Sequence, residues 1–305
     1  NTVLLQTRVR AATIYPSAIE PWDRCITGTE GCAPGFGYDP LAFAVEECHK
    51  RGMELHAWIA TIPVGAKNSM GCRLLRQKGF RIRNYATGAY LDPADPNVPS
   101  YLAAICGEIV RNYDVDGINL DYIRYPEKEI PFNDNKTYAH YGHGQPKAQW
   151  RRDNVTRTVR KVAEAVRSVR PWVKMSCSPI GKYADLPLHL SYGWNARDAV
   201  NQDAQAWLRE GWMDMLFPMM YFDGKHFYPF AVNWHEQSIN RPVIPGLGIY
   251  FLDPSEKDWD LQRVVRQINF TRQLGMNGQA YFRSRFLLNN VKGLLDFVTD
   301  AYRQP

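Results

Sequence analysis

Short apolar runs alternate with amphipathic stretches along the whole chain. The apolar runs predict strands at residues 2–9, 53–61, 117–123, 173–178, 214–221, 242–250 and 278–282. Apolar residues at helical spacing predict helices at residues 40–51, 100–113, 148–169, 201–210, 230–240, 260–274 and 289–302. The sequence therefore predicts that strands and helices alternate from one end to the other.

Such alternation, with nearly continuous apolar strands, is typical of a parallel sheet covered by helices. A doubly wound sheet would call for a Gly-rich first turn, and the chain contains no GxGxxG motif and no change of composition that marks a linker. The pattern favours an α/β fold, a single TIM-type (β/α)8 barrel over residues 1–305. Because a closed barrel has eight strands, we expect the first strand to be missing or truncated, or one strand to be unrecognised.

Long irregular segments follow the first four predicted strands, at residues 10–39, 63–99, 124–147 and 179–200. Active sites of such barrels lie at the carboxyl ends of the strands, where these segments begin. All four segments carry aromatic residues, namely Tyr15, Trp22, Tyr90, Tyr125, Tyr138, Tyr141, Tyr192 and Trp194. We expect long loops at this face, with aromatic side chains that wall a groove.

The third predicted strand carries a carboxylate in an apolar setting. Alternation places Asn119 and Asp121 on one face and Ile118 and Leu120 on the other. The apolar pair packs against helices, so Asn119 and Asp121 are expected to point into the barrel. A buried carboxylate is costly unless it is hydrogen-bonded or used, and acid/base catalysis is one such use. A structural aspartate that holds neighbouring loops is the alternative.

The first two predicted strands supply polar groups at a matching depth. Gln6 and Arg8 share a face of the first strand, and His56 and Trp58 share a face of the second. Arg8 is a candidate to neutralise Asp121 or to bind a substrate carboxylate. His56 is either a base or a hydrogen-bonded filler, and Trp58 is either a sugar-stacking platform or a core residue.

At the end of the fifth predicted strand, Tyr221 is expected to face the ligand and to donate a hydrogen bond to a sugar hydroxyl or a developing charge. Asp223 follows on the same side, as an acid, a base or a loop cap. Glu127, soon after Asp121, is another candidate acid/base. The remaining predicted substrate-binding residues are Arg124, Tyr125, Trp150, Trp194 and Tyr250.

The segment around Asp121 resembles the strand motif of family-eighteen chitinases, DGxDxDxE followed by Tyr-Pro. Asp116, Gly117 and Asp121 are in register, but Ile123 stands where those enzymes have their proton-donating glutamate. The acid must therefore be Asp121 itself or a group from a neighbouring loop. The Met-x-Tyr pattern that ends at Tyr221 is also similar to the chitinases, where this tyrosine contacts the reacting sugar.

The chain resembles the glycoside-hydrolase-like family ten more closely, in motifs that follow one another along most of its length. They include YPSAIEPW (15–22), HKRGMELHAW (49–58), DGINLDYIRYP (116–126) and GWMDMLFP (211–218). The resemblance implies a barrel protein of a largely bacterial, exported family that includes a divisome-associated hydrolase of peptidoglycan glycan strands. It also implies a periplasmic, cell-surface or secreted location. Two departures, Tyr122 for an aspartate and Met219 for a glutamine, suggest a changed substrate or a lost activity.

The predicted function is therefore hydrolysis of glycosidic bonds in a polysaccharide or a peptidoglycan glycan strand. Glycosidases commonly use two carboxylates, about 5–5.5 Å apart for retention and about 6.5–9.5 Å apart for inversion. If the sugars carry 2-acetamido groups, the substrate's own amide can act as nucleophile, and one protein acid suffices. A non-catalytic carbohydrate-binding barrel is the alternative.

The composition of the chain indicates which classes of molecule it can bind. The 9 Trp, 17 Tyr and 13 Phe suit the stacking of flat ligands, and the net charge of +6 permits an anionic glycan. Basic residues form no block of the kind that binds nucleic acid, and no apolar run is long enough to span a membrane. We expect a carbohydrate polymer as partner and a monomer.

Two further features carry weaker alternatives. His140 and His143, with Asp134, suggest a metal-dependent hydrolase, but the spacing has poor specificity and no metal or other cofactor is expected. Six cysteines are too few for a disulfide scaffold, although Cys25 and Cys32 could pair in an oxidising compartment.

Overall fold

The computed structural model describes residues 1–126 and 132–303. Its main sheet is parallel and has the strand order β1-β2-β6-β7-β8. Each strand pairs with the next strand of this sheet along the chain. The five strands are β1 (Thr2–Arg8), β2 (Glu54–Ala60), β6 (Gly117–Asp121), β7 (Lys174–Cys177) and β8 (Met215–Leu216).

Two short parallel strands continue the series, β9 (Gly246–Leu247) and β10 (Ala280–Tyr281). Parallel bridges from Leu216 to Val243 and from Met219 to Gly246 join β8 to the segment that contains β9. All seven predicted strands are thus present, and the α/β fold with a parallel sheet is confirmed. In the described residues no pairing joins β10 to β1, so the additional strand stays a prediction.

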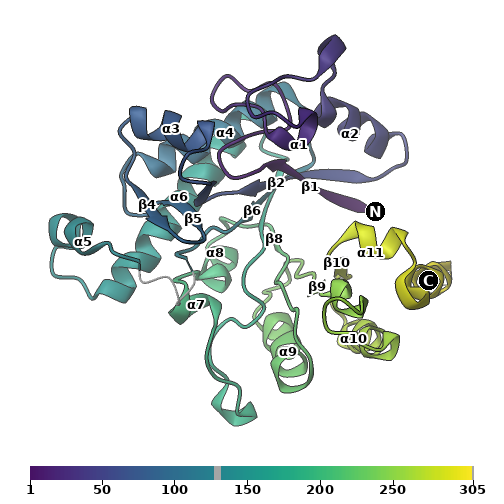
Figure 1. Cartoon of the computed structure of the whole chain (residues 1–305). Coiled ribbons are helices and arrows are strands. Elements are labelled where there is room, and N and C mark those ends of the chain that lie inside the picture. Colours follow the sequence, from purple (N-terminus) through teal and green to yellow (C-terminus); the bar gives the residue numbers. More distant parts are fainter. Residues whose placement is uncertain (127–131, 304–305) are drawn as a thin grey trace.

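Helices surround the strands, as Figure 1 shows. Those that match predicted helices are α2 (Pro40–His49), α4 (Val98–Asn112), α6 (Lys147–Val169), α8 (Ala204–Arg209), α9 (Tyr228–Glu236), α10 (Leu261–Gln273) and α12 (Leu294–Arg303). Shorter ones are α1 (Arg24–Thr27), α3 (Met70–Gln77), α5 (Asn135–Tyr141), α7 (Ala196–Ala199) and α11 (Ser284–Leu288). Single 3-10 turns are η1 (Gly35–Gly37), η2 (Pro187–His189), η3 (Gly224–His226), η4 (Ile249–Leu252) and η5 (Val291–Gly293).

Local sequence explains where the main helices begin and which face they bury. The Asp39 side chain accepts hydrogen bonds from the backbone of Leu41 and Ala42, and so caps α2 with Pro40 at its first position. In α6, Val155, Val159, Val162 and Val166 recur at helical spacing and are all buried. The α6 helix packs against α4, while every residue of β6 is buried. The polar residues of β6, Asn119 and Asp121, are therefore shielded from water.

A small antiparallel sheet with the strand order β3-β5-β4 occupies part of the segment predicted to be a loop at residues 63–99. Its strands are β3 (Pro63–Gly65), β4 (Ile82–Tyr85) and β5 (Gly88–Leu91). Strands of three or four residues offer too few positions for an alternating pattern, which is why the sequence did not reveal them.

The helices of the described part include none long and apolar enough to cross a membrane. Cys25 and Cys32 are both exposed, and their thiols are not joined.

Candidate active site

Asp121 is the last residue of β6, at the carboxyl end of the parallel sheet, and only 4 % of it is exposed. Two donors hold its carboxylate. The indole Nε1–H of Trp58 donates to Oδ2 over 3.0 Å, and the backbone N–H of Tyr122 donates to Oδ1 over 2.7 Å. Tyr122 has a φ of 53°, so the chain turns sharply just after the strand. The turn brings the Tyr122 N–H back onto the carboxylate.

Burial raises the pKa of Asp121 from 3.8 to about 6. The positive charge of Arg124 and the hydrogen bonds from Tyr122 and Trp58 act in the opposite direction, because they favour the ionised form. Desolvation outweighs all three. Asp121 therefore exchanges its proton close to neutral pH, where a general acid or base is most effective.

Four aromatic rings from separate strands and loops surround this end of the sheet. Tyr221 stacks on Phe282 with ring centres 5.3 Å apart, and Tyr250 meets both rings edge-on. Trp58 meets Phe282 edge-on at 6.3 Å. We call Trp58, Tyr221, Tyr250 and Phe282 the aromatic cluster. Trp58 thus contacts Phe282 of the cluster through its ring, and it contacts Asp121 through its Nε1–H.

The hydroxyl of Tyr221 lies within electrostatic reach of Asp121. Burial, followed by the negative charge of Asp121, holds the pKa of Tyr221 well above its usual range. Tyr221 therefore stays protonated and can donate a hydrogen bond throughout the physiological pH range.

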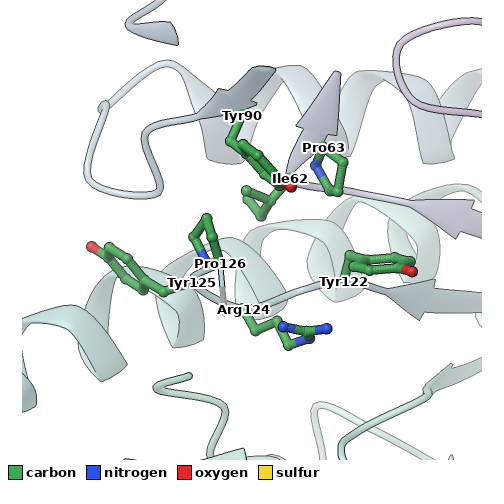
Figure 2. A pocket seen from close by; sticks show the side chains of 7 residues that line it. All are labelled: Ile62, Pro63, Tyr90, Tyr122, Arg124, Tyr125 and Pro126. Atoms are coloured by element: carbon green, nitrogen blue, oxygen red, sulfur yellow. The ribbon is translucent and has the colours of Figure 1, made fainter. Parts of the chain in front are cut away.

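Arg124 lies on the other side of the turn and is 5 % exposed. Its guanidinium lies 5.1 Å from the ring centre of Tyr122 and 5.9 Å from that of Trp194. A hollow of about 30 Å³ opens here, lined by Ile62, Pro63, Tyr90, Tyr122, Arg124, Tyr125 and Pro126. Figure 2 shows the rings of Tyr122 and Tyr125 at opposite ends of the segment that joins them, with Arg124 between them. The hollow has room for about one water molecule and not for a sugar ring.

Arg8 has a different partner from the predicted one. Its guanidinium donates to the Glu20 carboxylate, with Nη2 to Oε1 at 2.8 Å, and to the backbone carbonyls of Ala60 and Thr61. The strand register shifts between Gln6 and Arg8, which breaks the alternation that placed both on one face. The predicted pairing of Arg8 with Asp121 is wrong, and Arg124 is the cation that lowers the pKa of Asp121.

His56 and Asn119 are fully buried, which matches the alternative of a hydrogen-bonded filler for His56, and a contact of either residue with substrate stays a prediction. His56 Nε2 lies 3.0 Å from Glu54 at the start of β2, and burial lowers its pKa. Asn119 donates to Ser176 Oγ and accepts from Ser178 Oγ, each over 3.0 Å. Both side chains fill the interior of the sheet below Asp121.

Two predicted groove aromatics are part of the core instead. Trp150 is 4 % exposed and packs edge-on against Tyr138. Tyr125 is 1 % exposed and lies between Phe132 and the guanidinium of Arg151. Neither ring presents a surface on which a sugar could stack.

The proposed partner acids do not lie beside Asp121 in any described contact. The Asp223 carboxylate accepts from the backbone N–H of Gly224 and pairs with Arg263 over 3.0 Å, which matches the loop-cap alternative. Glu127 lies outside the described residues. A catalytic role for either residue stays a prediction.

In the alternative of a metal site at His140 and His143, the third ligand would be Asp134, but its carboxylate has other partners. Asp134 pairs with Arg151 and Lys147, both over 2.7 Å, and His140 packs against the ring of Tyr141. Within residues 1–126 and 132–303, no group of three side chains is arranged to hold a metal ion.

The structure therefore brings together Asp121, Arg124, Trp58, Trp194, Tyr221 and Tyr250 from the predicted set. Gln6 is half-buried and lies opposite Trp58 in the strand register, so its contact with substrate stays a prediction. Sequence reasoning missed Phe282, which contacts all three other rings of the aromatic cluster. Its place at the end of the last predicted strand was the available signal, because that is where barrel sites lie.

Comparison with solved structures supports the fold. An alpha-L-fucosidase isoenzyme 2 from Paenibacillus thiaminolyticus matches with a TM-score of 0.61 and 14 % identity, over 92 % of this chain and 40 % of its own. The catalytic domain of a beta-amylase from Paenibacillus polymyxa matches with a TM-score of 0.54 and 10 % identity, over 82 % of this chain and 81 % of its own. At these identities the likeness shows a shared fold.

Sequence comparison shows the family. Glycosyl hydrolase YngK of Bacillus subtilis (strain 168) is 31 % identical over all of this chain and 64 % of its own length. Glycosyl hydrolase DigH of Escherichia coli (strain K12) is 30 % identical over 94 % of this chain and 72 % of its own length. The chain thus spans just under two thirds of the first relative. The model of the family described as glycosyl hydrolase-like 10 matches residues 1–252, and the chain belongs to that family.

Proposed function

We propose that the protein is a glycoside hydrolase that cleaves a polysaccharide, with Asp121 as its acid. The observation that carries the proposal is the state of Asp121, a buried carboxyl group at the carboxyl end of a central strand with a pKa raised to about 6. Family membership and the glycosidase names of its relatives support the same reaction.

The chemistry follows from what surrounds Asp121. Its O–H donates a proton to the glycosidic oxygen while the bond from that oxygen to the anomeric carbon breaks. The carboxylate that remains accepts hydrogen bonds from Trp58 and Tyr122 and faces the charge of Arg124. These three groups stabilise the ionised product of the proton transfer, so they lower the barrier to it. In this proposal the Tyr221 hydroxyl, which stays protonated, donates a hydrogen bond to the reacting sugar.

A single carboxyl group is sufficient if the sugar carries a 2-acetamido group. In that case the amide oxygen attacks the anomeric carbon as the leaving group departs. Water then attacks the same carbon, returns a proton to Asp121 and restores the amide. This substrate-assisted route suits a site in which Asp121 has no described carboxylate beside it. Peptidoglycan glycan strands carry such groups, so they are the substrate we propose first, with an exported location for the protein.

The test is the release of new reducing ends from glycan strands whose peptides an amidase has removed. The wild-type protein should release them, and Asp121→Asn should lower turnover by about 10²–10⁴-fold, because the acid is lost. Binding of the strands should persist in Asp121→Asn, since the aromatic cluster is intact.

Two outcomes would contradict the proposal. Equal turnover in the wild type and in Asp121→Asn would exclude Asp121 as the acid. Binding without any turnover in the wild type, across peptidoglycan, chitin and mannan, would favour the non-catalytic carbohydrate-binding barrel.

A further inference from the structure

The loop between β7 and α7, residues 178–195, lies beside α9 (Figure 1) and is fixed at its base. The backbone carbonyl of Gly181 accepts a hydrogen bond of 2.7 Å from the Trp234 indole on α9. A Cβ atom at Gly181 would lie 2.5 Å from the carbonyl oxygen of Met219, so only glycine fits this close approach. The residue after it, Lys182, is therefore held in a defined place.

Lys182 is only 4 % exposed, and burying its ammonium group costs free energy. Its Nζ donates to the carbonyl of Tyr192 over 2.7 Å and lies 5.7 Å from the ring centre of Phe230. An ammonium has three donors, and no carboxylate of the described residues forms an ion pair with this one. Burial of the cation therefore lowers the pKa of Lys182, although the negative charge of Asp185 acts in the opposite direction.

Two more basic groups lie at the same place. Ser191 Oγ is 2.7 Å from Nδ1 of His226, which joins this loop to η3. Lys225 precedes His226 and is exposed. Burial, followed by the positive charges of Lys182 and Lys225, lowers the pKa of His226, so the three basic side chains lie within electrostatic range of one another. We call Lys182, Lys225 and His226 the basic cluster.

The carboxylates near the basic cluster, Asp185 and Asp223, have hydrogen-bond or ion-pair partners of their own. Asp185 favours the charged form of Lys182, but its Oδ1 accepts from the Gly193 N–H over 3.0 Å and from Asn195 Nδ2 over 3.1 Å. Asp223 pairs with Arg263 over 3.0 Å. Asp185 offsets part of the charge of Lys182, and an external anion bound between Lys182 and Lys225 would relieve the repulsion that remains between these two like charges.

We propose that the basic cluster binds a carboxylate group carried by the glycan. The loop itself connects the two sites, because Trp194, two residues after Tyr192, lies 5.9 Å from the Arg124 guanidinium next to Asp121. A polymer bound across Asp121 and Trp194 would present its next substituents to Lys225 and His226, with Lys182 beneath them. The identity of the ligand as a glycan rests on the proposed function, whereas the anion site rests on the basic cluster alone.

The test compares two polymers that share a backbone of 2-acetamido sugars. Peptide-stripped peptidoglycan strands carry a carboxylate on alternate sugars, and chitin oligosaccharides of equal length carry none. Calorimetry in the Asp121→Asn background should show tighter binding of the carboxylated strands. Lys225→Met should weaken that binding about threefold, because Lys225 is exposed. Lys182→Met should weaken it about tenfold or more, because its charge is buried. Neither change should alter the affinity for chitin.

Lys161→Met is the matched control, since Lys161 is exposed on α6, far along the chain from the loop. The ring signals of His226 should shift when the carboxylated strands are added. An unchanged preference for the carboxylated strands in Lys225→Met, with an unmoved His226 ring, would overturn the anion site. If the wild type releases no reducing ends but the preference depends on the basic cluster, the glycosidase proposal fails and the anion site stands.

Discussion

At the scale of single residues, the sequence identified Asp121 correctly as a polar group at the end of a buried strand, but it misjudged the partners of that group. The DGINLD segment forms a strand because its apolar residues fit a sheet buried on both faces. What the alternating pattern could not give is the backbone turn at Tyr122, which supplies one donor to the carboxylate. Trp58, proposed as a platform for sugars, supplies the other donor through its indole nitrogen.

This arrangement predicts how Trp58→Phe changes the pH dependence of catalysis. The indole N–H favours the ionised form of Asp121, so its loss should raise the pKa of Asp121 above its present value of about 6. Because the protonated form is the acid, the alkaline limb of kcat/KM should move to higher pH while kcat falls. A pH–rate profile on amidase-stripped strands measures both.

Trp172→Phe is the control for this prediction, since Trp172 is 70 % exposed. An alkaline limb that stays in place in Trp58→Phe, or moves to lower pH, would show that Trp58 does not set the proton affinity of the acid.

At the scale of elements, the positions of the main strands and helices could be read from periodicity, whereas irregularities within them could not. The register shift in β1 is the clearest example, since it removes Arg8 from the face of Gln6. No residue type signals that shift. Its result is a buried ion pair, with Arg8 fully buried and Glu20 6 % exposed, that joins the end of β1 to the loop that follows it. Tyr101 on α4 also donates to Glu20.

Glu20→Gln should therefore destabilise the protein strongly. The change leaves the guanidinium of Arg8 buried without a counter-charge, which costs about 3–5 kcal/mol. Urea unfolding monitored by tryptophan fluorescence gives the free energy of unfolding. Glu46→Gln, which removes one of the two carboxylates that pair with Lys50 at the surface, should cost less than about 1 kcal/mol. Equal, small losses in the two variants would mean that the Arg8–Glu20 pair contributes little.

At the scale of the whole molecule, the chain forms seven parallel strands in the described part, and their carboxyl ends gather Asp121, the aromatic cluster and the base of the loop at residues 178–195. The sequence predicted this face because parallel strands and their long loops are visible as patterns. It could not predict which aromatics are exposed there, since Trp150 and Tyr125 look the same in sequence as Trp58 and Tyr221. Their burial depends on packing against Tyr138 and Phe132, which the residue type of Trp150 and Tyr125 does not reveal.

Burial of Asp121 at this face lowers the stability of the fold at neutral pH. The folded protein holds the Asp121 proton up to a pH of about 6, whereas the unfolded chain releases it near 3.8. The folded state thus binds more protons between these values, so the stability contribution of Asp121 falls as pH rises through this window. Above it, an ionised Asp121 lowers the free energy of unfolding by about 3 kcal/mol.

Asp121→Asn removes the ionisation, so the stability of the variant relative to the wild type should rise by about 2 kcal/mol between pH 4 and pH 8. The comparison is made between pH values because the amide also changes the hydrogen bonds with Trp58 and Tyr122, an effect that does not depend on pH. Urea unfolding of both proteins at each pH provides the measurement. Asp114→Asn, whose side chain is 73 % exposed, controls for the loss of one surface charge. A relative stability that is flat with pH, or that falls, would show that the fold does not raise the pKa of Asp121. The proposed role of Asp121 as the acid would then lose its basis.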